Sequence, residues 1–234
     1  MPYPHRHLQK LSKLFDTIFL FRKAETKNSK VRHLMWPRDL REGFERLHEV
    51  PKERFLAMIN NNCTPHGDFK RELYSERLRA IKYFSSKEGF DLWGGRWDRL
   101  LFFPHWNKFG AVKKSWRGYI EGDKLEMLAK YKFAIAFENS SYPGYVSEKI
   151  FDCFLTGVVP VYLGAPDVTE YVPKDCFIDM REFKTYADLE KYLRAVPDRE
   201  LVLYRERFIK YLYSVKDTIF SKRLFAEKIW NALG

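Results

Sequence analysis

The chain has 234 residues, of which 45% are hydrophobic, so it can bury a core as one domain or two small ones. Its 42 basic and 31 acidic side chains give a net charge of +11, which favours polyanions, anionic lipid or nucleotide substrates without deciding among them. The sequence lacks a secretory signal and any apolar run of roughly 20 residues, and its three cysteines lack paired spacing, so we expect a soluble cytoplasmic protein without a disulfide framework.

The front of the chain predicts two short strands and a connector. Apolar side chains run through residues 14–21 and again through 33–36, and both runs suit buried strands. Residues 38–53 are charged and contain Gly43 and Pro51, which disfavour a long regular helix. We therefore expect a domain boundary in this connector, with a front region over residues 1–50 and a main domain over residues 51–234.

The main domain begins with a strand, a polar loop and a helix. Residues 55–59 form an apolar run that leads into a loop containing Asn62. A helix is expected from Arg71 through Leu78, and we expect Arg77 and the basic residues that follow it to face solvent without a functional role. Residues 90–93 predict the next strand.

Residues 96–114 interleave aromatic side chains with lysine and arginine, a composition that could stack nucleic-acid bases. Pro104 and Gly110 interrupt the segment, and no recognised nucleic-acid module surrounds it. Packing beneath a surface loop is therefore the favoured interpretation. His105 is a lone acid/base candidate, and lone histidines are usually structural.

The most informative stretch is Tyr131–Gly164. Residues 132–137 predict a strand buried on both faces, and a polar turn follows it. Ser147 can cap the next helix, which has one apolar stripe and ends at Gly157. Because residues 158–163 predict a second strand, the stretch is typical of a right-handed parallel crossover.

Ligands of open α/β sheets bind beyond the carboxyl ends of the strands. Polar residues that could bind or react gather at this edge, namely Glu138, Asn139, Tyr145, Ser147, Glu148 and Lys149. The free N–H groups and the dipole of the helix start favour a phosphate there. The alternative is that Ser147 is simply a cap and that Glu148 and Lys149 are solvated charges of the first turn.

Three runs in this stretch, FENS, YVSEK and GVVPVYLG, resemble the donor-binding signature of the family 10 glycosyltransferases, the α1,3/α1,4-fucosyltransferases that use GDP-fucose. Upstream segments resemble the same family in the same order: FLAMINNN, RELYSERL, FDLWGG and GYIEGDKLEMLAKYKF. The resemblance implies an α/β fold with a Rossmann-like parallel sheet flanked by helices. It further implies a GT-B type donor domain with a shortened amino-terminal part.

The resemblance also implies site roles. Arg71 matches the arginine that contacts the donor diphosphate, a task that suits its permanently charged fork, although it could simply decorate an exposed face. Lys149 would bind the same diphosphate, and Glu148 would lie near the fucose and steady the developing cation. The remaining predicted donor-binding residues are Asn62, Glu138, Asn139, Tyr145 and Ser147. No general base is assigned, because in the family it belongs to the amino-terminal domain.

The implied function is inverting transfer of L-fucose from GDP-fucose to a sugar hydroxyl of a glycan acceptor, in α1,3 or α1,4 linkage. No cofactor is expected to be required, no metal site is predicted, and a divalent metal would at most stimulate. Two alternatives stay open. One is a nucleotide-sugar-binding module without full activity, and the other is a basic protein that binds nucleic acid or an anionic membrane surface. We expect no specific nucleic-acid partner, whereas peripheral membrane association remains open.

Overall fold

The computed structural model describes residues 7–24, 26–38, 43–63, 70–98, 109–215, 218 and 220–232. At its centre is a five-stranded parallel sheet with the order β4-β3-β5-β6-β7. Its strands are β3 (Arg54–Ile59), β4 (Phe90–Trp93), β5 (Tyr131–Phe137), β6 (Val159–Leu163) and β7 (Ile178–Asp179). The predicted parallel α/β sheet is confirmed.

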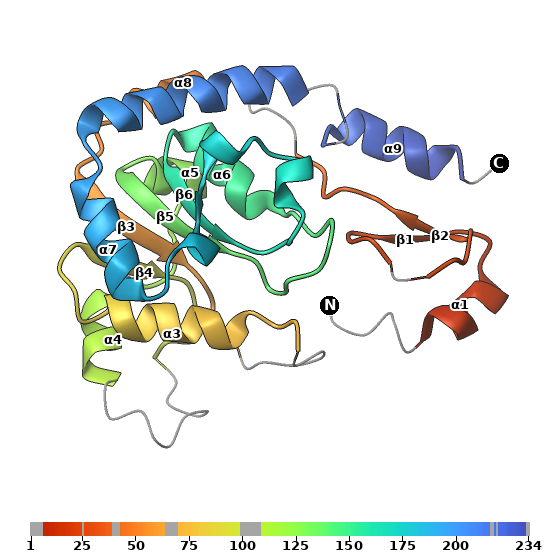
Figure 1. Ribbon diagram of the computed structural model, residues 1–234, viewed down its shortest axis with the longest axis horizontal. Coiled ribbons are helices and arrows are strands. Elements are labelled where there is room, and N and C mark those ends of the chain that lie inside the picture. Colours follow the sequence, from red (N-terminus) through yellow and green to blue (C-terminus); the bar gives the residue numbers. More distant parts are fainter. Residues whose placement is uncertain are drawn as a thin grey trace.

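Helices cover both sides of this sheet, with α3 and α4 on one side and α6 and α8 on the other (Figure 1). The helices of the main part are α2 (Glu45–His48), α3 (Tyr74–Phe84), α4 (Phe109–Ser115), α5 (Lys124–Leu128), α6 (Glu148–Thr156), α7 (Tyr186–Ala195) and α8 (Asp198–Val215), with the short 3-10 helices η2 (Val168–Glu170), η3 (Lys174–Cys176) and η4 (Met180–Glu182). Helix α7 begins with a reciprocal capping box formed by Thr185 and Asp188.

The crossover β5–α6–β6 matches its prediction. Strands β5 and β6 are parallel neighbours, paired from Phe133 with Val159 to Phe137 with Leu163. Helix α6 ends at Gly157, whose φ of 64° is a left-handed conformation that glycine adopts without strain. This crossover therefore fixes where the polar loop between β5 and α6 leaves the sheet.

Aromatic side chains attach α6 to the long helix α8. The ring centroids of Phe154 and Phe208 lie 4.7 Å apart, and both side chains are fully buried. Phe151 packs in the same layer, with its centroid 4.5 Å from that of Phe220. Since burying a phenylalanine side chain contributes about 2–3 kcal/mol, this contact anchors the helix that carries the candidate site.

The front of the chain differs from its prediction. Residues 14–21 are not one buried strand, because helix α1 (Leu8–Leu14) occupies their start and strand β1 covers just Ile18–Leu20. Phe15 is 55% exposed, and its N–H closes the last turn of α1 by donating to the Leu11 carbonyl. The second strand, β2 (Val31–His33), ends where it was expected to begin. A short apolar run does not by itself separate a helix end from a strand.

Strands β1 and β2 form a separate two-stranded parallel sheet that lies beside helix α9 (Lys222–Trp230), away from the main sheet (Figure 1). Phe21 connects this small sheet to α9. Its ring centroid lies 4.6 Å from that of Trp36, which follows β2, and 6.2 Å from that of Phe225 in α9. The chain thus returns from α8 to its own front section. The proposed boundary near residue 50 stays a prediction.

Other expectations concern small features. The thiols of Cys63, Cys153 and Cys176 are free. Among the helices of the described ranges, none has the length and apolar character needed to span a bilayer. Most of the aromatic and basic segment, including His105, falls outside the described residues.

His48 gives the fold an acid-sensitive contact. Its side chain is 5% exposed, and Nε2 lies 2.8 Å from the Phe154 carbonyl oxygen, so the neutral ring donates there. Burial lowers the pKa of His48 to about 4. Because the unfolded imidazole titrates near 6.5, the unfolded chain alone takes up this proton as the pH falls from about 6.5 to 4.

We therefore expect the free energy of unfolding to decrease as the pH falls through that window, with His48 contributing on the order of 2 kcal/mol to the decrease. His48→Gln should lose less stability over the same window. Urea unfolding of both proteins at pH 7.0 and pH 4.5 measures the difference, and carboxylate titrations cancel in the comparison. Identical losses in the two proteins would contradict the assignment.

Candidate functional site

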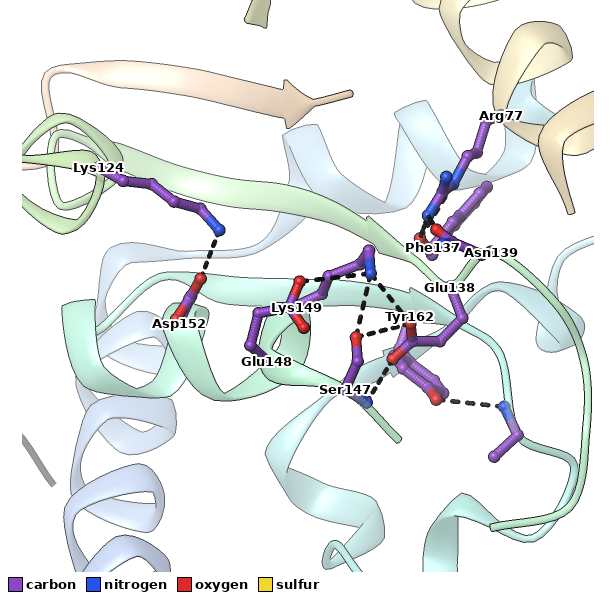
Figure 2. A network of polar contacts seen from close by, with 11 residues as sticks. Arg77, Lys124, Phe137, Glu138, Asn139, Ser147, Glu148, Lys149, Asp152 and Tyr162 are labelled. Carbon is purple, nitrogen blue, oxygen red and sulfur yellow. Dashed lines mark hydrogen bonds and ion pairs between the residues drawn. The ribbon is translucent and has the colours of Figure 1, made fainter. Parts of the chain in front are cut away.

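The candidate site is built around Glu138, which directly follows β5. Its side chain is fully buried, at 0% exposure. The carboxylate accepts hydrogen bonds from the Ser147 backbone N–H at 2.8 Å and the Ser147 hydroxyl at 2.7 Å, and it pairs with Lys149 Nζ at 3.2 Å (Figure 2). An unpaired buried charge would be costly, so these partners are required. Glu138 thereby fixes the first turn of α6 to the end of β5.

Ser147 occupies the predicted N-cap position of α6, but its hydroxyl makes no capping hydrogen bond. The hydroxyl instead donates to Glu138 and lies 3.0 Å from Lys149 Nζ. A hydrogen bond to a charged acceptor is stronger than one to a neutral partner, which explains why the hydroxyl turns to the carboxylate. The interpretation of Ser147 as a simple cap is therefore wrong.

Lys149 is also not a solvated surface charge. Its side chain is 22% exposed, and Nζ lies between Glu138 and Glu148, at 3.2 and 3.5 Å (Figure 2). Burial acts to raise the pKa of Glu148, but the Lys149 ammonium group, a hydrogen bond from its own backbone N–H and the charge of Lys124 together hold that pKa below its usual value. The first turn of α6 therefore presents an ionised carboxylate beside a partly buried ammonium group.

Arg77 joins the site, contrary to the expectation that it faces solvent. It is 4% exposed and donates to the Phe137 carbonyl at 2.6 and 3.1 Å and to Asn139 Oδ1 at 2.7 Å. Its role could have been found in the sequence, because it shares one helical face with the buried apolar residues of α3. Those residues are Ala80, Ile81 and Phe84.

Arg71 is not in a helix, since α3 begins at Tyr74. The chain around Arg71 pairs instead with the loop after β5: Ser141 N–H donates to the Arg71 carbonyl at 2.7 Å, and Leu73 N–H donates to the Asn139 carbonyl at 3.0 Å. These bonds use backbone groups that a helix would need. The loop pairing brings Arg71 to the same edge as Asn139, and its guanidinium lies over the Tyr142 ring at 5.0 Å.

Two further predicted donor-binding residues are Asn62, which lies in the loop after β3, and Tyr145, which lies in the loop before α6. Asn62 Nδ2 donates to the Arg96 carbonyl at 3.0 Å, a contact that connects the loops after β3 and β4. Burial raises the pKa of the Tyr145 phenol, and the nearby charges of Glu138 and Glu148 act in the same direction. Tyr145 is therefore a neutral hydroxyl beside the carboxylates.

The front section touches the loop between β5 and α6. Lys23 N–H donates to the Pro143 carbonyl at 2.8 Å, and Lys23 Nζ pairs with Asp167 at 2.7 Å. His33 Nε2 lies 3.1 Å from the Gly144 carbonyl oxygen, and burial lowers the pKa of this imidazole, so the neutral ring donates there. The loop that holds Asn139 and Tyr145 is thus supported from both sides.

A small cavity of about 40 Å³ opens at the carboxyl ends of β3 and β5. Three cationic side chains line it, Arg77, Lys124 and Lys149, together with Asp152 and an apolar floor from both strands. A volume of this size accommodates water and not a larger ligand, which would have to lie over the opening. Within the described residues, no group of acidic, histidine or cysteine side chains is arranged to hold a metal ion.

Comparisons with known proteins point to one family. The family described as "Glycosyltransferase family 10 (fucosyltransferase) C-term" matches residues 101–232. The chain is 40% identical over 166 residues to the mouse 4-galactosyl-N-acetylglucosaminide 3-alpha-L-fucosyltransferase 9. The matched region covers 68% of this chain and 38% of the mouse protein. The chain spans between 18% and 38% of the length of curated relatives that it matches.

Solved structures confirm the fold. A crystal structure of an alpha1,3-fucosyltransferase with GDP matches at a TM-score of 0.55 and 18% identity, covering 89% of this chain and 72% of that one. The S. aureus protein TarM matches at a TM-score of 0.62 and 10% identity, covering 97% of this chain and 45% of that one. The predicted GT-B type architecture is thus confirmed for this chain as a similarity to part of larger glycosyltransferases.

Proposed function

The chain belongs to glycosyltransferase family 10, the fucosyltransferases, and on this premise we propose that it binds GDP-fucose and transfers L-fucose to a sugar hydroxyl of a glycan. The names of its relatives support an α1,3 or α1,4 linkage, since they include an alpha-(1,4)-fucosyltransferase of Arabidopsis thaliana and an alpha-(1,3)-fucosyltransferase of Helicobacter pylori.

One observation carries the proposal most directly: a fully buried carboxylate, Glu138, holds Lys149 at the carboxyl edge of the sheet where α6 begins. Ligands of open α/β sheets bind at this edge, and a helix start favours anions. Lys149 would bind the diphosphate together with Arg71. Asn139 and Tyr145 would hold the nucleotide, with Asn62, Glu138 and Ser147 completing the donor site.

The chemistry follows from these charges. When the bond between fucose C1 and the diphosphate oxygen breaks, negative charge grows on GDP, and a fixed ammonium group such as that of Lys149 stabilises it. Positive charge grows on the sugar ring, and the ionised Glu148 would stabilise that charge. The acceptor oxygen attacks the opposite face, which inverts the anomeric centre, and passes its proton to a general base that we leave unassigned.

Thermal unfolding of the full chain with added ligands tests the proposal. At 100 times Kd, GDP or GDP-fucose should add about 2.7 kcal/mol of stability, which corresponds to a rise in Tm of about 5–10 °C, whereas UDP should do much less. Incubation with GDP-fucose and an N-acetylglucosamine-containing acceptor should then release GDP. Equal shifts with any polyanion would favour the charge-only alternative, and binding without turnover would favour a binding module.

A further inference from the structure

Lys124 and Asp152 form a second charged pair, which lines the same cavity as Lys149. Lys124 begins helix α5, and its Nζ lies 2.6 Å from Asp152 Oδ2 (Figure 2). The Asp152 side chain is 4% exposed. On α6, Asp152 stands three positions after Lys149 and four after Glu148, so all three share one face of the helix.

Asp152 is held firmly in place. Its second oxygen, Oδ1, forms an ion pair with Arg38 Nη2 at 2.5 Å, without the geometry of a hydrogen bond. A buried carboxylate with a cation near each oxygen has little freedom to rotate, and it keeps one cationic partner when the other is shared with a ligand. Asp152 therefore fixes the direction in which the Lys124 ammonium group approaches the cavity.

Lys124 is also the cation of this cavity that is most accessible to a ligand. Its side chain is 39% exposed, compared with 22% for Lys149, while Arg77 as a residue is 4% exposed. Arg77 is committed to the end of β5, and Lys149 is shared between two carboxylates. The ammonium group of Lys124 can therefore turn toward a ligand at a lower cost than either neighbour.

The balance of charges around the cavity also indicates a role for Lys124. Glu138 and Glu148 together offset the positive charges of Lys149 and Arg77, so those four groups alone offer no excess charge to an anion. Asp152 offsets one of its two cationic partners, which leaves one positive charge over. A nucleoside diphosphate carries several negative charges, so this excess adds to the positive charge of Arg71, which the proposed function already places at the diphosphate.

We propose that Lys124 is a further donor-binding residue that contacts the diphosphate of the nucleotide sugar, and that Asp152 is its positioning residue. The inference rests on the proposed function, because it assumes that a nucleoside diphosphate binds at this edge. On binding, Lys124 exchanges part of its contact with Asp152 for phosphate oxygens. The cavity between Lys124 and Lys149 then lies beneath the diphosphate.

Calorimetric titration of the full chain with GDP and with guanosine tests the inference. Lys124→Ala and Lys124→Gln should each weaken GDP binding about 10-fold or more, because a charged hydrogen bond to phosphate is lost, and should leave guanosine binding unchanged. Lys210→Ala removes the same charge from an exposed position of α8 and should change neither affinity. A misfolded variant would lose guanosine binding as well.

The role of Asp152 is measured by a double-mutant cycle. Asp152→Asn should change GDP affinity when Lys124 is present and should have no further effect in the Lys124→Ala protein, whereas a purely structural role would give equal effects in both. Unchanged GDP affinity in both Lys124 variants, with GDP bound by the parent protein, overturns this inference alone. No GDP binding by the parent protein overturns the proposed function and this inference together.

Discussion

Replacing Lys149 with alanine is expected to weaken GDP binding by 100-fold or more. Lys149 is the ammonium group that Glu138, Ser147 and the start of α6 hold at the ligand edge. Its loss removes the proposed charged contact to the diphosphate and leaves the fully buried Glu138 without its cation. Calorimetric titration with GDP measures the effect, and Lys210→Ala is the control for net charge.

The same substitution should destabilise the fold by about 3 kcal/mol, because breaking a buried ion pair leaves one charge unpaired. The two effects can be separated by the double variant Glu138→Gln/Lys149→Ala, which removes both charges. It should recover part of the stability but none of the GDP affinity. A folded Lys149→Ala protein that binds GDP as tightly as the parent would contradict the proposed donor site.

The fold around the site was predictable because its local signals agree. The strand, polar turn, helix and second strand of residues 131–164 each show one clear pattern, and Gly157 marks the helix end. The front section lacks such agreement. An apolar run shared between the end of α1 and the short β1 carries no period that distinguishes them, so it suggests one strand.

The sequence predicts which residues gather at the site better than it predicts the contacts between them. The polar residues after β5 point to a ligand edge, but nothing in the sequence reveals that Glu138 is fully buried or that Ser147 and Lys149 turn toward it. Those contacts depend on how tightly α6 closes onto the strand. The position of Arg71 likewise depends on pairing with the distant loop after β5.

Arg77→Leu is expected to destabilise the protein by about 3–4 kcal/mol, the largest cost we predict for a single side chain outside the donor contacts. The substitution leaves the Phe137 carbonyl and the Asn139 side chain without the donor that joins them to α3. The Phe137 carbonyl is buried and the Asn139 side chain half-buried, and a buried acceptor without a partner costs about 1–3 kcal/mol. Leucine also cannot reach as far as the guanidinium group. Urea unfolding at pH 7 measures the loss.

Arg79→Ala is the matched control, because this arginine lies two positions along the same helix with its side chain 65% exposed and paired with Glu76. An exposed pair of this kind contributes between about 0 and 1 kcal/mol. Equal destabilisation by the two variants would show that Arg77 acts as an ordinary surface residue. If Arg77 does hold the end of β5, its loss should also weaken GDP binding, since Asn139 would no longer be oriented by α3.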